Sequence, residues 1–252
     1  MNRARSDLTG VGFDPWRFRV GRSVNGFTLI EMIVVISVIG LLAALIFPLV
    51  AGARNAGMRT RTRAELIQLE TSIEEYKTKL GFYPPDNAPN WAVNQLYYEL
   101  SGTTNMDRLA YRTLDGANWM SDRKDVFEVF YGAGTPVSGF LNCSRSEEAV
   151  ATCFVKNLKP GQWAIVWWPW DLPIHPDFAV LAGPIPWPGP NPYLAAQPQI
   201  VNRTINPWCY NSSNPRFNHR SYDLWIDIVV GGKTNRICNW SERPLIVSTL
   251  YP

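Results

Sequence analysis

The most pronounced pattern in the chain is an apolar run from Phe27 to Val50, whose 24 residues include a single charged residue, Glu31. As an α-helix this run would be about 36 Å long at about 1.5 Å per residue, which exceeds the roughly 30 Å hydrocarbon core of a bilayer. A buried helix of a soluble protein is the alternative, but such helices rarely stay apolar on every face over this length. The pattern therefore predicts a membrane-spanning helix.

A helical pattern with one apolar face continues beyond this run. Its apolar positions recur at intervals of three and four residues, at Leu66, Leu69, Ile73, Tyr76 and Leu80. Gly81 suits a helix C-cap, and Pro84 with Pro85 prevents further helix. We therefore expect one helix over residues 27–80, kinked near Pro48, whose second half packs against the rest of the chain.

Strand patterns are concentrated in the C-terminal half. Apolar, aromatic and β-branched residues predict strands over Gln162–Trp168, Phe178–Leu181 and Tyr222–Val230, with a further strand at Val126–Tyr131. Gly231-Gly232 predicts a turn, Asn94–Leu100 a short helix, and the six prolines of residues 183–200 a loop. The fold class expected is α+β. A long N-terminal helix, half membrane-spanning and half amphipathic, packs on a small C-terminal antiparallel β-sheet with long loops.

Composition and charge narrow the class of protein. Hydrophobic residues make up 46% of the chain and charged residues 18%, which is too apolar for a disordered polypeptide. The net charge of +3 lies entirely in residues 1–26, which hold five arginines and two aspartates. The remaining residues hold 19 basic and 19 acidic residues, so no nucleic-acid partner is expected.

The basic N-terminus before an apolar run is typical of a targeting signal, and it favours an N-terminus in the cytoplasm. Four arginines on the other side of the run, Arg54, Arg59, Arg61 and Arg63, oppose this orientation rule.

The junction between the basic segment and the apolar run reads Gly26-Phe27-Thr28-Leu29-Ile30-Glu31. It resembles the prepilin processing motif of type IV pilins and type II secretion pseudopilins. The resemblance implies that a membrane peptidase cuts after Gly26 and that the new N-terminus, Phe27, is then methylated. It also implies that the helix is retained as membrane anchor and filament core, with Pro48 as the family's helix-kinking proline.

Glu31 is the residue of the apolar run whose position most needs a physical reason. A carboxylate within a membrane-spanning segment costs a few kcal/mol on insertion scales, so it marks a functional position. The family resemblance implies that it pairs with the free α-amino group of Phe27 in a neighbouring subunit, since opposite charges in an apolar core must be paired. Such a pair would set the register of filament assembly. A carboxylate tolerated near the membrane interface is the alternative.

Two further segments resemble major pseudopilins. They are the turn Gly81-Phe82-Tyr83-Pro84 and the C-terminal block from Asn206 to Trp240. In that family the acidic turn of the C-terminal block often binds calcium, but here residues 231–236 contain two bases and no acid. Asp223 and Asp227 are the remaining candidate ligands. We expect no cofactor, with calcium as the alternative, and we expect EDTA to leave the melting temperature unchanged.

The sequence contains no Walker A, G-x-S-x-G or C-x-x-C motif. Asp171, His175 and Asp177 have the side chains of metal ligands, but they lie among prolines without a second cluster. We therefore expect no catalytic residues.

Four cysteines, Cys143, Cys153, Cys209 and Cys238, follow the membrane-spanning run and would lie in an oxidising periplasm. Their positions favour the disulfides Cys143–Cys153 and Cys209–Cys238, each contributing about 2–4 kcal/mol. Four buried free thiols are the alternative, and the spacing disfavours zinc.

Together these features predict a cytoplasmic leader over residues 1–26, a transmembrane and filament-core helix over 27–50, and a periplasmic pilin-like domain over 51–252. The expected function is that of a structural subunit of a type II secretion pseudopilus anchored in the bacterial inner membrane. A type IV pilin or minor pilin acting in adhesion or DNA uptake is the alternative. The resemblance implies as partners further copies of the chain, other pseudopilins or pilins, a prepilin peptidase and an inner-membrane assembly platform.

Overall fold

The computed structural model describes residues 26–88, 90–105, 107–121, 127, 139–146, 150–156, 158–166, 178–194 and 204–248. The chain divides into two compact units, Met1–Leu49 and Val50–Pro252. The predicted leader up to residue 25, most of the expected strand Val126–Tyr131 and the Asp171, His175 and Asp177 group lie outside the described residues.

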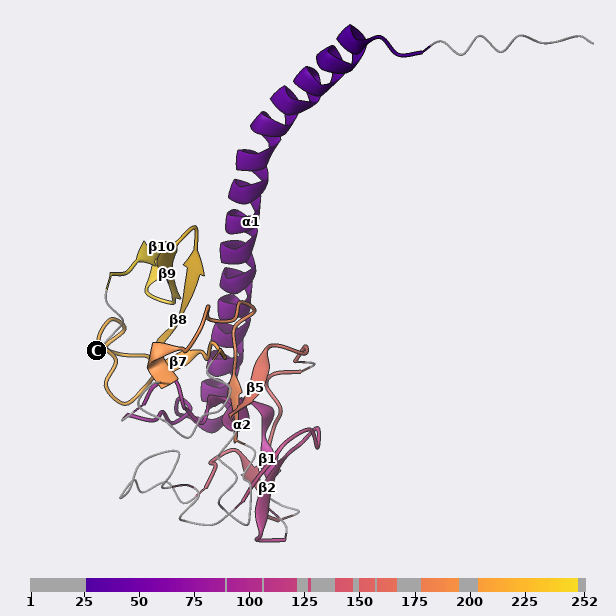
Figure 1. Cartoon of the computed structure of the whole chain (residues 1–252). Coiled ribbons are helices and arrows are strands. Elements are labelled where there is room, and N and C mark those ends of the chain that lie inside the picture. Colours follow the sequence, from indigo (N-terminus) through magenta and orange to yellow (C-terminus); the bar gives the residue numbers. More distant parts are fainter. Residues whose placement is uncertain are drawn as a thin grey trace, which may run out of the picture. The chain divides into compact units, whose positions relative to one another are not determined.

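Helix α1, Leu29–Leu80, is the first element (Figure 1). In the first unit its apolar side chains are exposed on all sides, with Leu29 77% and Phe47 73% exposed. By length and apolar composition α1 can cross a membrane. Pro48 lies inside the helix, and the kink expected there stays a prediction.

Within the second unit α1 buries the apolar face that the sequence predicts. Leu66, Ile73 and Tyr76 are fully buried, Leu69 is nearly so, and Leu80 is partly buried against the core. The helix ends at Leu80 and is followed by Gly81, whose φ of 88° is readily adopted by glycine. The Gly81 N–H donates to the Lys77 carbonyl at 2.8 Å. Both the apolar face and the helix end are confirmed.

The segment after α1 begins with a short helix, α2, Leu96–Ser101, which confirms the helix expected at residues 94–100. Four short strands follow: β1 Thr103–Thr104, β2 Ala110–Thr113, β3 Trp119–Ser121 and β4 Cys143–Ser144. They form a sheet in the order β3-β2-β1-β4, in which only the β1–β4 pair is parallel. The sequence pattern did not predict this sheet.

A two-stranded antiparallel sheet comes next, formed by β5, Trp163–Val166, and β6, Phe178–Leu181. Val166 lies opposite Phe178. The predicted bounds of β6 are confirmed, and β5 begins one residue later than expected. A 3₁₀ turn at Pro192–Leu194 lies within the proline-rich loop.

The C-terminal sheet has four antiparallel strands in the order β10-β9-β8-β7. They are β7 Cys209–Asn211, β8 Asp223–Val230, β9 Lys233–Cys238 and β10 Ser241–Ile246. The two-residue turn between β8 and β9 has positive φ at Gly231 and Gly232, as a type I′ hairpin requires. The predicted strand and turn are confirmed. The fold is α+β, with several sheets in place of the single small sheet expected.

A buried carboxylate joins three parts of the core. Glu99 on α2 is fully buried and accepts hydrogen bonds from the Tyr76 hydroxyl on α1 (2.9 Å) and from the backbone N–H groups of Leu141 (2.8 Å) and Asn142 (2.9 Å). Burial raises the pKa of Glu99, although these donors act in the opposite direction. The carboxylate therefore fixes the segment before β4 against both helices.

Replacing Glu99 with alanine should lower the free energy of unfolding by more than about 2 kcal/mol, because two buried donors, on Tyr76 and Asn142, and the partly buried N–H of Leu141 would lose their acceptor. Thermal or urea unfolding of the purified full chain in detergent measures this loss. Glu75→Ala, on the exposed side of α1, is the matched control and should change stability by less than about 0.5 kcal/mol. Equal effects of the two substitutions would contradict the role assigned to Glu99.

Candidate functional site

The start of α1 is held by reciprocal hydrogen bonds between Thr28 and Glu31. The Thr28 backbone N–H and hydroxyl both donate to Glu31 Oε2 at 2.8 Å, and the Glu31 N–H is 3.3 Å from Thr28 Oγ1. This is a capping box, which satisfies N–H groups at a helix start that have no partner within the helix. Sequence reasoning missed it, although the Thr-x-x-Glu spacing is its signature.

Gly26 lies outside the helix in an open environment. No atom lies within 4 Å of the position that a Cβ would take at Gly26, and Phe27 is 76% exposed. The predicted cleavage position is therefore an exposed, non-helical peptide directly before a capped helix. The predicted methylation of Phe27 and the pairing of Glu31 with a neighbouring subunit involve partners that this structure does not contain, so both stay predictions.

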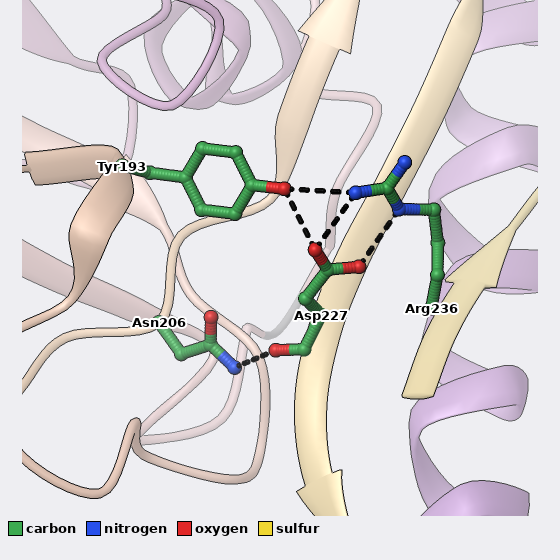
Figure 2. A network of polar contacts seen from close by, with 4 residues as sticks. All are labelled: Tyr193, Asn206, Asp227 and Arg236. Carbon is green, nitrogen blue, oxygen red and sulfur yellow. Dashed lines mark hydrogen bonds and ion pairs between the residues drawn. The ribbon is translucent and has the colours of Figure 1, made fainter. Parts of the chain in front are cut away.

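The C-terminal sheet contains a buried polar cluster in the region where the family resemblance raised a calcium site (Figure 2). Asp227 on β8 accepts from Arg236 on β9 through both carboxylate oxygens, at 2.8 and 2.9 Å, and from the Tyr193 hydroxyl at 2.7 Å. Asn206 donates to the Asp227 carbonyl at 2.8 Å. The cluster therefore ties the proline-rich loop to the sheet.

Charge balance explains why this buried cluster is stable. The side chains of Asp227 and Arg236 are almost completely buried, and burial by itself lowers the pKa of Arg236. The hydrogen bond and the charge of Asp227 outweigh burial and raise that pKa above its ordinary value. Arg236 therefore supplies the positive charge that Asp227 needs.

Asp223, the other candidate calcium ligand, is also engaged within the chain. Its carboxylate accepts from the backbone N–H groups of Arg216 (2.6 Å), Phe217 (3.1 Å) and Asn218 (2.9 Å). It orders the loop before β8. In the part of the chain that the structure describes, no group of three or more His, Cys, Asp or Glu residues could hold a metal ion.

The four cysteines are free thiols, so the predicted disulfides are not formed. Cys209 and Cys238 both lie opposite Trp225, one on each side of β8. Two strand spacings separate their Cα atoms by roughly 10 Å, beyond the roughly 7 Å limit for a disulfide. The prediction of Cys209–Cys238 is wrong because the central strand β8 lies between β7 and β9.

The prediction of Cys143–Cys153 fails differently. The two segments are adjacent, since the Asn142 side chain bonds the backbone of Thr152 at 2.7 and 2.9 Å. The two thiols, however, contact different backbone carbonyl groups. Cys143 Sγ lies 3.7 Å from the Ser144 carbonyl oxygen, and Cys153 Sγ lies 3.5 Å from the Val155 carbonyl oxygen.

Comparison with known proteins supports the N-terminal motif. Residues 21–47 match the family described as the prokaryotic N-terminal methylation motif. The chain is similar to type II secretion system core protein G of Klebsiella michiganensis, with 35% identity over 63 residues, which are 25% of this chain and 44% of that protein. The corresponding Escherichia coli protein is 36% identical over 63 residues, 25% of this chain and 43% of that protein. The Vibrio cholerae protein is 30% identical over 63 residues, which are 25% of this chain and 43% of that protein.

The chain therefore carries a prepilin-type N-terminal methylation motif over residues 21–47. Its N-terminal quarter is distantly homologous to type II secretion system core protein G. The matched region spans less than half the length of each of these relatives. No solved structure matches the chain significantly.

Replacing Asp227 with alanine should destabilise the chain by about 3–5 kcal/mol, because Arg236 would remain buried without a carboxylate partner. Unfolding of the full chain in detergent measures the loss. Arg112→Ala, which removes the exposed pair with Asp107 (3.2 Å), is the matched control and should cost no more than about 1 kcal/mol. The double variant Asp227→Leu/Arg236→Met should recover much of the lost stability. A double variant no more stable than Asp227→Ala would contradict this explanation.

Removing divalent ions should leave the melting temperature of the chain unchanged, because Asp223 and Asp227 are satisfied by backbone N–H groups, Tyr193 and Arg236. Differential scanning calorimetry with EDTA and with added Ca²⁺ tests this. A fall of several degrees with EDTA that excess Ca²⁺ reverses would show that calcium binds.

Proposed function

We propose that the chain is a structural subunit of a type II secretion pseudopilus, processed between Gly26 and Phe27 and assembled through its N-terminal helix. The observation that carries the proposal is that the methylation motif, residues 21–47, coincides with the start of a helix whose apolar side chains are uncovered. The relatives of the N-terminal quarter are type II secretion system proteins, which favours secretion over adhesion or DNA uptake.

Processing after Gly26 would leave the helix start intact. Thr28 and Glu31, which form the capping box, both lie on the C-terminal side of the cut. The cut would create a positively charged amine at Phe27, four residues before Glu31. Methylation of that amine keeps its positive charge, so a cation and a carboxylate would lie at the start of every mature subunit.

Two features of the N-terminal part of α1 would drive assembly: its exposed apolar side chains need to be covered, and its single carboxylate, Glu31, needs a positive partner. Burying a large apolar side chain stabilises by about 1.5–3 kcal/mol relative to water, and the bilayer supplies this stabilisation. Helices of other subunits would have to cover the same side chains when the helix leaves the bilayer. Glu31 would enter that apolar core only with a compensating charge. The Phe27 amine of a neighbouring subunit supplies it, and this pairing specifies one axial register.

The proposal places the chain in the inner membrane as a single-pass precursor, with its N-terminus in the cytoplasm and residues 51–252 in the periplasm. Its partners would be further copies of itself, other pseudopilins, prepilin peptidase and the inner-membrane assembly platform. The role is structural, and no catalytic step is assigned to it.

Glu31→Leu should abolish filament formation while membrane insertion and processing continue, because a leucine suits the bilayer but cannot pair with an amine. Electron microscopy of sheared filaments from overexpressing cells measures assembly. Mass spectrometry of the membrane fraction should find a mature chain that begins with methylated Phe27.

Thr28→Val is the matched control, because it removes the hydroxyl of the capping box but keeps the carboxylate. It should still assemble. Normal filaments from Glu31→Leu, or equal loss in both variants, would contradict the pairing and favour a role for Glu31 in capping its own helix. A membrane-bound chain that retains residues 1–26 would contradict the proposed processing.

A further inference from the structure

Four arginines follow the membrane-spanning segment on the side where the positive-inside rule predicts few, and the proposed function gives them no role. They are Arg54, Arg59, Arg61 and Arg63. Arg61 lies 3.8 Å from Glu65 on the same helix. Arg59 and Arg63 instead line a cavity within the second unit.

The cavity lies between α1 and the β9–β10 end of the C-terminal sheet and has a volume of about 350 Å³. This is at the lower end of the roughly 300–1,000 Å³ typical of small-molecule sites. Three of its lining residues are arginines: Arg59, Arg63 and Arg243. Glu242 is the one acidic residue in the lining, so the charged residues of the site sum to +2.

Two of these arginines are held in place by neutral groups. Arg63 Nη1 donates to the Cys238 carbonyl at 2.6 Å and to the Ser241 carbonyl at 2.8 Å. Arg59 Nε donates to Asn235 Oδ1 at 3.1 Å. A guanidinium has five N–H donors, so these contacts orient the side chains and leave further donors for a ligand.

Two carboxylates lie near this group of arginines: Glu242 lines the cavity, and Glu70 interacts electrostatically with Arg63. Among the described residues, none of Arg59, Arg63 and Arg243 has a carboxylate oxygen within 4.0 Å of its guanidinium nitrogens. Two arginines that are held in place, Arg59 and Arg63, and the exposed Arg243 line one small cavity. This positive lining matches a ligand that has several acceptor oxygens and a negative charge. Phosphate has both properties, and arginine binds it with two parallel hydrogen bonds.

From this geometry we propose that the cavity bounded by Arg59, Arg63 and Arg243 is a binding site for a phosphate group. The phosphate could come from an anionic lipid headgroup or from a soluble phosphate compound, since both present the same oxygens. This site would give Arg59 and Arg63, two of the four arginines beyond the membrane-spanning segment, a function that does not depend on filament assembly.

Titration of the purified full chain in a neutral detergent with inorganic phosphate tests the site, by calorimetry at constant ionic strength in chloride. The double variant Arg59→Gln/Arg243→Gln should bind at least tenfold more weakly. Arg220→Gln, at an exposed arginine in the loop before β8, is the matched control and should bind within twofold of the parent. Acetate should bind at least tenfold more weakly than phosphate to the parent chain.

Thermal unfolding of each variant verifies that it is folded. If the double variant does not fold, the single variant Arg243→Gln, at an exposed position, should still weaken phosphate binding at least threefold. Absence of phosphate binding to the parent, or equal binding by parent and variant, would overturn the proposal. Filament formation is not a readout here, so failure of this site leaves the proposed function untouched.

A competition experiment distinguishes the two sources of phosphate. Glycerol 1-phosphate and a soluble short-chain phosphatidylglycerol are each added to the phosphate-loaded chain, with short-chain phosphatidylcholine as control. Displacement at least tenfold better by phosphatidylglycerol than by the other two would assign the site to an anionic lipid. Equal displacement by glycerol 1-phosphate and phosphatidylglycerol would assign it to the phosphate group alone. Displacement by none of the three would overturn the site.

Discussion

The apolar side chains of helix α1 are exposed in its N-terminal part and buried in its C-terminal part, and both the fold and the proposed function depend on this difference. Over residues 29–49 the large apolar side chains are exposed, and covering them would stabilise by an amount on the order of tens of kcal/mol. Further along, α1 turns one apolar face, including Leu66, Ile73 and Tyr76, into a folded core. The N-terminal part therefore needs a membrane or other helices, whereas the C-terminal part is already covered by its own chain.

Buried polar side chains, more than regular strands, hold the long loops of the second unit to this helix and its sheets. Glu99 fixes the segment before β4, and Asp227 with Arg236 fixes the proline-rich loop through Tyr193. Asp223 orders the loop before β8 through three backbone N–H groups. Each carboxylate accepts several hydrogen bonds, as a buried charge requires. Loops with few ladder hydrogen bonds thereby acquire defined positions.

Features with a strong local signal could be predicted from the sequence. The periodicity of α1, the cap at Gly81, the β8 strand and its glycine turn are such features, because each depends on neighbouring residues. The sheet of β1–β4 could not be predicted, since strands of two to four residues carry almost no periodic pattern. The order of the strands in the C-terminal sheet could not be predicted either, and for this reason the predicted disulfide between Cys209 and Cys238 was wrong. The partners of Asp227 depend on long-range contacts, whereas the Thr28–Glu31 capping box is local and was overlooked.

The central claim is that the uncovered half of α1 becomes the core of a filament in which Glu31 meets a neighbouring amine. A cryo-electron microscopy reconstruction of filaments containing this chain tests it most directly. The account predicts that residues 27–50 lie at the filament axis, with the Glu31 carboxylate within hydrogen-bond or ion-pair distance of the Phe27 nitrogen of another subunit. Filaments held together by residues 51–252, with the apolar helices on the outside or Glu31 paired only with Thr28, would contradict it.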